Sequence, residues 1–191
     1  MKLLYVASIA AVSLVLAFSA HSPGAGVLGQ TTSEQTAGGS IVLPPGYRDW
    51  PLISVAAVGP PVNDIRAKLG DATAMGDLRK GTIPYSDGAT IARLAWKQTT
   101  DPQTANAIKL QAQQFGLPPD AIAKLLSLSF VAGPPINVQL MVKDSRRFAS
   151  TGGWGFAQFT NGKPDTIEPR TCFACHEPAK AADFVFTRYA P

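Results

Sequence analysis

The chain has 191 residues, of which 46% are hydrophobic and 16% are charged, and this composition is that of a folded globular protein, not a disordered one. Its formal net charge of +4 is spread along the sequence without a run of like charges, which disfavours a dedicated nucleic-acid binder. The chain holds only two cysteines and two histidines, which excludes most metal sites that need several such ligands. The length predicts about one domain.

The N-terminal part of the chain predicts an exported protein. A lysine precedes the apolar run from Leu3 to Phe18, and small residues follow it, which is the pattern of a secretory signal peptide over residues 1–19. The run is shorter than a typical spanning helix, so an uncleaved membrane anchor is the less favoured alternative. Residues 20–40 are rich in Gly, Ser and Thr and predict a flexible tether, which leaves residues 41–191 as the folded domain. We therefore expect a periplasmic or secreted location, where disulfides are permitted.

The folded region begins with two predicted strands and a capped helix. Trp50 to Val58 is rich in Val, Ile and Leu, which favour strands, and Asn63 to Leu69 is a second apolar run. Asp71 is a typical helix-capping residue, and it predicts a helix from Ala72 to Lys80 that ends at Gly81.

A strand with two different faces follows a predicted turn at Asp87-Gly88. Alternate residues share one face of a strand, and this strand is predicted from Ala89 to Gln98. One face carries Arg93 and Lys97, whereas the other carries Ala92, Leu94 and Trp96.

Two helices and two further strands complete the pattern. Asp101 to about Phe115 and Pro118 to about Ser129 both begin with residues typical of helix starts. Ile136 to Lys143 alternates apolar and other residues, which predicts a half-buried strand, and Trp154 to Phe159 predicts another. Strands mixed with short helices, without a repeat or a βαβ alternation, indicate an α+β fold and disfavour a parallel doubly wound sheet.

The sequence Cys172-Phe173-Ala174-Cys175-His176 is the signature of covalent haem c attachment. Cysteines three apart on a helical turn lie on one face, where their thiols can add to the two vinyl groups on one edge of a porphyrin. The histidine that follows can then bind the iron as the proximal ligand. The motif therefore predicts Cys172 and Cys175 as cofactor-binding residues, His176 as the metal ligand, and one covalent haem c per chain.

Three other interpretations of this motif stay open. A redox-active dithiol usually lies where a strand enters a helix of a βαβ unit. A zinc site needs four ligands, and here only His21 or a carboxylate could supply the fourth. A structural disulfide beside a surface histidine is the third interpretation.

The other axial position of the iron separates two classes of function. With His176 as the proximal ligand, residues 41–191 hold no other histidine, so bis-histidine ligation is excluded. Met75 or Met141 could be the sixth ligand of an electron-transfer cytochrome, although methionine at such positions more often packs in a core. The sequence favours an open position, which binds small molecules or acts on them.

Five segments carry a recognisable pattern: the opening from Leu43 to Trp50, Met141 to Ala149, Gly152 to Phe156, the haem motif from Thr171 to His176, and Asp183 to Tyr189. Together they resemble the cytochrome P460 family. The resemblance implies a largely antiparallel β-sheet with a few helices, a five-coordinate haem c and a homodimer. It also implies a small nitrogen oxide, nitric oxide or hydroxylamine, as ligand or substrate, and a soluble redox partner.

One residue departs from the hydroxylamine-oxidising members of that family. The resemblance implies that those members attach a lysine to the porphyrin edge from the strand after the Asp-Gly turn, where this chain has Arg93. A guanidinium is a poor nucleophile, so Arg93 is expected to form no such bond, and hydroxylamine oxidation is correspondingly less favoured. An ion pair between Arg93 and a haem propionate is an alternative role, and Lys97 could replace the lysine only in a different register.

The remaining candidates concern the distal side of the haem. Asp165 and Glu168, in the loop before the motif, are candidate catalytic bases. Trp154, Phe156 and Phe159 are candidates for an aromatic wall that admits only diatomic ligands, and each also fits a packed core.

Overall fold

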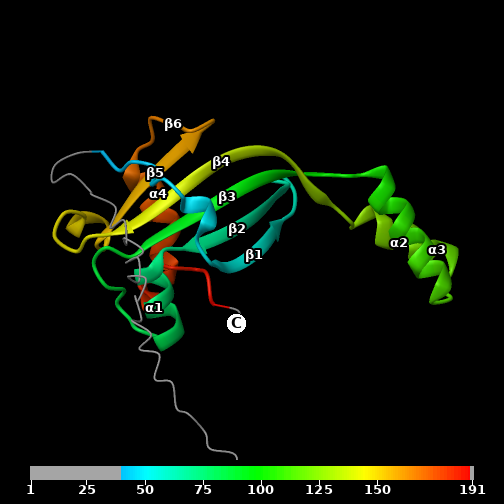
Figure 1. The fold of residues 1–191 in the computed structure, drawn as a ribbon, viewed down its shortest axis with the longest axis horizontal. Coiled ribbons are helices and arrows are strands. Elements are labelled where there is room, and N and C mark those ends of the chain that lie inside the picture. Colours follow the sequence, from blue (N-terminus) through cyan, green and yellow to red (C-terminus); the bar gives the residue numbers. More distant parts are fainter. Residues whose placement is uncertain (1–39, 190–191) are drawn as a thin grey trace, which may run out of the picture. The chain divides into compact units, whose positions relative to one another are not determined.

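The computed structural model describes residues 40–189 (Figure 1). The predicted signal peptide and all but the last residue of the predicted tether lie outside the described residues. Within residues 40–189, no helix has both the length and the apolar character needed to cross a membrane.

The described part of the chain is built on one antiparallel sheet of six strands, and neighbouring strands in the sheet are also neighbours in the sequence. This arrangement confirms the predicted α+β class and the antiparallel sheet. The strands are β1 (Leu52–Val58), β2 (Asp64–Gly70), β3 (Thr90–Thr99), β4 (Val131–Lys143), β5 (Trp154–Thr160) and β6 (Lys163–Pro164).

Four α-helices and three short 3₁₀ helices connect or cover the strands in residues 40–189. The α-helices are α1 (Ala72–Lys80), α2 (Pro102–Gln114), α3 (Pro119–Ser127) and α4 (Pro169–His176), and the 3₁₀ helices are η1 (Tyr47–Asp49), η2 (Ala149–Thr151) and η3 (Glu177–Ala182). Helix α1 has the predicted ends, because the Asp71 carboxylate accepts a hydrogen bond from the Ala74 N–H at 2.8 Å and Gly81 adopts the left-handed conformation.

The helical hairpin α2–α3 is inserted between β3 and β4. The two strands still pair where the hairpin leaves them, since Thr99 lies opposite Val131. Strand β4 therefore begins before the predicted start at Ile136, because its ladder with β3 extends to the base of the hairpin. Helix α2 starts as predicted, with the Asp101 carboxylate accepting from the Thr104 N–H at 2.7 Å.

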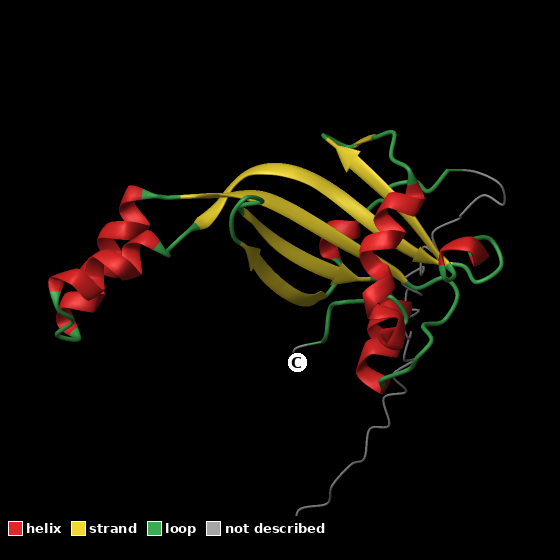
Figure 2. Ribbon diagram, turned by 180° about the vertical axis from the view of Figure 1, so that it is seen from behind, coloured by secondary structure: helices red, strands yellow, loops and turns green. Residues whose placement is uncertain are grey.

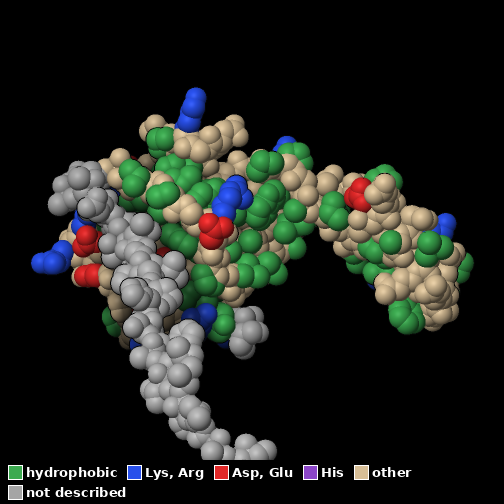
Figure 3. Space-filling model, in the orientation of Figure 1, with side chains coloured by type: hydrophobic (Ala, Val, Ile, Leu, Met, Phe, Trp, Pro, Cys, Tyr) green, Lys and Arg blue, Asp and Glu red, His purple; other side chains and the backbone are tan. Residues whose placement is uncertain are grey.

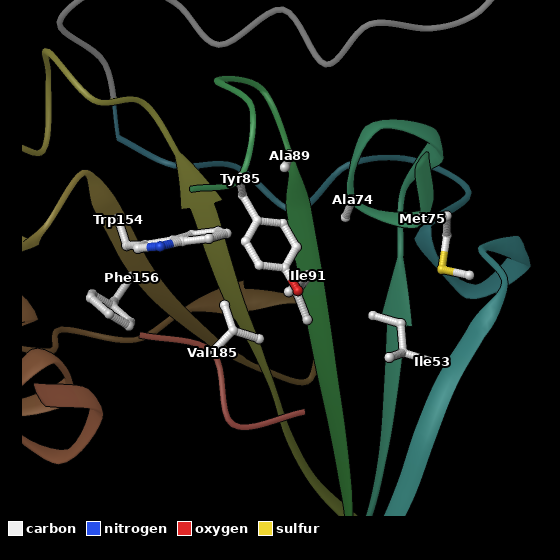
Figure 4. Packing of buried hydrophobic residues seen from close by; sticks show 9 residues of the cluster. All are labelled: Ile53, Ala74, Met75, Tyr85, Ala89, Ile91, Trp154, Phe156 and Val185. Carbon is white, nitrogen blue, oxygen red and sulfur yellow. The ribbon is translucent and has the colours of Figure 1, made fainter. Parts of the chain in front are cut away.

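The sheet buries side chains on both faces. One face carries a cluster that η1 and the residues before β1 partly cover, and Figure 3 shows hydrophobic side chains gathered over this side of the sheet. Its buried members are Leu69, Ala92, Leu94, Leu140, Val142 and Phe159. Helix α4 lies over the opposite face, in front of the sheet in Figure 2. The cluster on that side, drawn in Figure 4, consists of Ile53, Ala74, Met75, Tyr85, Ala89, Ile91, Trp154, Phe156 and Val185.

The prediction of a half-buried strand over residues 136–143 is wrong at its C-terminal end. Lys143 lies on the non-apolar side of the alternation, yet only 4% of it is exposed. Its ammonium group is buried because it forms an ion pair with Asp183, at 2.8 Å, in the segment that follows η3. Both faces of the sheet are covered at this point because the chain returns across the sheet after α4. The alternation of residues within one strand does not reveal this return.

Candidate functional site

Helix α4 carries the cysteine pair and the histidine in its last two turns. The helix starts with Pro169 in its first turn and with the Glu168 carboxylate accepting from the Arg170 N–H at 3.2 Å. Cys172 and Cys175 are one helical turn apart and share a face of the helix. Both thiols are free, and both line the same cavity as His176.

The cavity lies between α4, the segment after η3, and the face of the sheet that α4 covers. Its volume of about 450 Å³ falls in the range of small-molecule and cofactor sites. One part of the wall is apolar, and one is cationic. The lining residues are Arg66, Lys68, Ile91, Arg93, Gln139, Leu140, Met141, Phe156, Ala157, Thr171, Cys172, Cys175, His176, Val185, Phe186 and Thr187.

The cationic part of the wall is built on β2 and β3. The buried carboxylate of Asp64 accepts from Arg66 Nε at 2.8 and 2.9 Å and from an Arg93 guanidinium N–H at 3.0 Å. The same guanidinium donates to Gln139 Oε1 at 2.6 Å. Lys68 lies opposite Arg93 in the β2–β3 ladder. Two guanidinium groups therefore share one carboxylate, and Lys68 adds a third cation beside them.

Positive charge is in excess at this end, because Arg66, Lys68 and Arg93 lie around the single carboxylate of Asp64. Burial lowers the pKa of Lys68, and the charges of Arg66 and Arg93 lower it further. Burial also lowers the pKa of Arg93, with Arg66 adding to the effect. In addition, the buried Arg93 Nε has no hydrogen-bond partner among the described residues. Buried donors are normally satisfied, so this end of the cavity is suited to an anionic group.

His176 is held in one tautomer by a backbone hydrogen bond. Its Nδ1 lies 2.7 Å from the carbonyl oxygen of Phe184. A carbonyl oxygen can only accept, so Nδ1 carries the proton and the lone pair of Nε2 is free to bind a metal. Nδ1–H donation to a backbone carbonyl is typical of histidine ligands.

Two phenylalanine rings flank the imidazole of His176. The ring centroids of Phe156 and Phe186 lie 5.2 and 5.3 Å from that of His176, both with an interplanar angle of 52°. Tilted aromatic neighbours at this distance restrict rotation of the imidazole. Phe156, one of the three predicted wall residues, therefore lies on the His176 side of the cavity.

The geometry disfavours the redox-dithiol and zinc interpretations of the motif. Burial raises the pKa of the Cys172 thiol, and Cys175 adds to the increase, whereas a reactive dithiol needs a lowered pKa. Cys175 also lies in the last turn of α4, where the helix dipole disfavours a thiolate. In residues 40–189, no three His, Cys, Asp or Glu side chains gather closely enough to hold a metal ion.

The two methionines considered as sixth ligands lie in different places. Met75 is 1% exposed, belongs to the core cluster beside Ile53, and does not line the cavity. Met141 lies on β4 and lines the cavity.

The two candidate catalytic bases do not line the cavity. Asp165 accepts from Gln158 Nε2 and Thr160 Oγ1, each at 2.8 Å, and these bonds lower its pKa. Glu168 caps the start of α4. Each carboxylate thus has a structural role in the connection between β5 and α4: Asp165 binds two side chains of β5, and Glu168 caps the first turn of α4.

Other predicted residues are divided between the two faces of the sheet. Arg93 lines the cavity, whereas Lys97 is exposed and does not. Trp154 is fully buried in the core cluster, where its indole N–H donates to the Asp183 carbonyl at 2.8 Å. Phe159 belongs to the core cluster on the opposite face, so its alternative interpretation, core packing, is confirmed and it does not line this cavity.

The sequence analysis missed the partners of Arg93. Arg66 and Lys68 are two apart on β2 and so share a face, but only the antiparallel register with β3 places that face beside Arg93. The carbonyl of Phe184 was also missed, since a backbone acceptor leaves no mark in the sequence.

An attachment helix with a C-x-x-C pair, a following histidine with a free Nε2, and a cavity with one apolar and one cationic part together form the arrangement of a c-type haem protein. The model of the family described as Cytochrome P460 matches residues 44–187. The chain therefore belongs to the cytochrome P460 family, and membership of this family implies haem c. No curated protein matches the chain.

Proposed function

We propose that this chain is an exported mono-haem c protein that binds small nitrogen oxides, nitric oxide above all, at an open iron position. The observation that carries the proposal is the His176 imidazole, with its Nδ1–H held by the Phe184 carbonyl and its Nε2 free, on the same cavity as two free thiols. These are the donors that a covalently attached haem needs.

The cavity residues fit a haem at three points. Cys172 and Cys175 would bond to the vinyl groups, and His176 would bind the iron through Nε2. The apolar wall of Ile91, Met141 and Phe156 suits the macrocycle. The cationic end, with the unpartnered Nε of Arg93, suits the two propionates, because bidentate pairing with carboxylates is a strong preference of guanidinium groups.

Ligand binding is favoured over hydroxylamine oxidation by the composition of the cavity wall. When bound, haem c supplies an iron that takes a small nitrogen ligand and exchanges single electrons. Oxidation of hydroxylamine also releases protons and so needs a base within reach. The described residues that line the cavity include no carboxylate, and His176 is already used as a ligand. Arg93, at the apparent position of the cross-linking lysine, supports the same choice.

Electron transfer is the second candidate function. The observation that favours it is Met141, which is one of the residues that line the cavity. A methionine on the second axial position would give a low-spin cytochrome without an open site.

Absorption spectra of the exported, haem-loaded protein separate these functions. We expect an ordinary high-spin haem whose spectrum changes on addition of nitric oxide, both in the wild type and in Met141→Leu. Turnover of hydroxylamine with a displaced Soret band would instead support an oxidase with a modified macrocycle. A low-spin spectrum that becomes high-spin in Met141→Leu would establish methionine ligation and overturn the proposal.

The proposal extends to location and partners. The signal-like N-terminus supports export to the periplasm or beyond, and the family resemblance supports a homodimer and a soluble redox partner. Cell fractionation and size-exclusion chromatography test location and dimer formation.

A further inference from the structure

A buried ion pair lies behind the segment that contacts His176. Lys143 and Asp183 are 4% and 6% exposed, and Lys143 Nζ lies 2.8 Å from both carboxylate oxygens of Asp183. The backbone N–H of Tyr85 donates to the same carboxylate at 2.8 Å, and Trp154 Nε1–H donates to the Asp183 carbonyl at 2.8 Å. Residue 183 is therefore fixed through both its side chain and its backbone.

The backbone at this point adopts a conformation that needs such support. Asp183 and Phe184 both have positive φ, 51° and 65°, which residues with a side chain adopt only at a cost. These two residues turn the chain so that the Phe184 carbonyl oxygen reaches His176 Nδ1 at 2.7 Å. The hydrogen bond to the imidazole thus depends on a strained turn that the ion pair holds in place.

Gly152 completes the support from the turn before β5. A Cβ at Gly152 would lie 2.3 Å from Phe184 Cε2 and 2.7 Å from Cζ, so a larger residue there must displace the ring. The Gly152 carbonyl accepts from Lys143 Nζ at 3.2 Å. Gly152 therefore both admits the Phe184 ring and shares the ammonium group of the ion pair.

Stability alone does not explain this arrangement, because a buried ion pair is often no more stabilising than apolar residues of similar size. We propose that Lys143, Gly152 and Asp183 are positioning residues for the axial histidine. By holding the Phe184 carbonyl they keep Nδ1 protonated, orient the imidazole, and set how strongly Nε2 donates to the iron. This inference rests on the proposed role of His176 as the axial ligand.

The test compares Gly152→Ala with Gly116→Ala in the full, haem-loaded protein. The two glycines have nearly the same positive φ, +67° and +70°, but a Cβ at Gly116 meets nothing within 4 Å. The comparison therefore separates displacement of Phe184 from the general cost of alanine in this conformation. The readouts are the iron–histidine stretching frequency of the ferrous protein and the reduction potential.

If the hydrogen bond from His176 Nδ1–H to the Phe184 carbonyl is weakened, Nε2 donates less electron density to the iron. The ferric state of the iron then loses stability relative to the ferrous state. In Gly152→Ala we expect a lower stretching frequency and a higher reduction potential, and in Gly116→Ala we expect wild-type values for both. Gly152→Ala that carries haem and keeps both wild-type values would overturn the positioning role.

A second variant decides the matter if Gly152→Ala fails to fold. Lys143→Met combined with Asp183→Asn replaces the ion pair by a neutral pair of similar size, and we expect the same two shifts. Wild-type values in this double variant would overturn the inference. A wild-type protein without covalent haem would instead refute the proposed function, and a haem stain on a denaturing gel reveals that outcome separately.

Discussion

Removing one member of the Lys143–Asp183 pair has a predictable effect on stability. Lys143→Met leaves the Asp183 carboxylate, which is 6% exposed, with neutral donors such as the Tyr85 N–H and without its cation. Loss of one partner of a buried ion pair costs about 3–5 kcal/mol. Since a domain is stable by only about 5–15 kcal/mol, this substitution should remove a large part of the free energy of unfolding.

Removing both charges should cost much less. Lys143→Met with Asp183→Asn leaves no uncompensated charge, and the asparagine amide oxygen can still accept from the Tyr85 N–H. We expect the double variant to lie within about 2 kcal/mol of the wild type, so the two substitutions should be strongly non-additive.

Urea denaturation followed by far-ultraviolet circular dichroism measures these differences at pH 7. We expect a large fall of the transition midpoint for Lys143→Met and a substantial recovery in the double variant, while the dependence of the unfolding free energy on urea concentration stays unchanged. The claim that Lys143 and Asp183 form a tightly buried ion pair would be refuted in either of two cases: if the losses of unfolding free energy were additive, or if Lys143→Met lost less than about 1 kcal/mol.

Two further predictions concern the buried tyrosine Tyr85 and the cavity residue Arg93. Burial, together with the charges of Asp77 and Asp183, raises the pKa of Tyr85 from 10.0 to about 12. The tyrosine therefore ionises at lower pH in the unfolded chain than in the folded protein. The stability that this difference contributes is fully present below pH 10 and is lost, by about 2–3 kcal/mol, between pH 10 and 12. The midpoint of urea denaturation should fall less across this pH range in Tyr85→Phe than in the wild type. An equal fall in both would contradict a raised pKa of Tyr85. Arg93→Leu removes a cation from the cavity wall and should lower the reduction potential of the haem-loaded protein, because the ferric state gains stability. Lys97→Leu, at an exposed position on the same strand, is the control, and an equal shift in both variants would contradict a specific role for Arg93.

Features that depend on local chemistry were predictable from the sequence. The ends of α1 follow from the capping carboxylate of Asp71 and from Gly81, and the structure has both as expected. The strand face with Ala92, Leu94 and Trp96 packs against the apolar cluster as its alternation predicts. The spacing of Cys172 and Cys175 placed both thiols on one side of a helix.

Features that depend on register and on the return of the chain were not predictable. Arg66 and Lys68 join Arg93 only because β2 pairs with β3 in one particular register. Lys143 is buried because Asp183, forty residues later in the chain, reaches it. The Phe184 carbonyl meets His176 through two residues with positive φ, Asp183 and Phe184. Aspartate tolerates this conformation, but a phenylalanine gives no signal of it in the sequence.

The mass of the protein, purified after co-expression with haem-maturation machinery, tests the central claim most directly. We expect that the polypeptide carries the mass of one haem after denaturation and extraction, and that Cys172→Ser and Cys175→Ser each lose at least one of the two thioether bonds. A polypeptide of unmodified mass, with both thiols free or joined to each other, would contradict it.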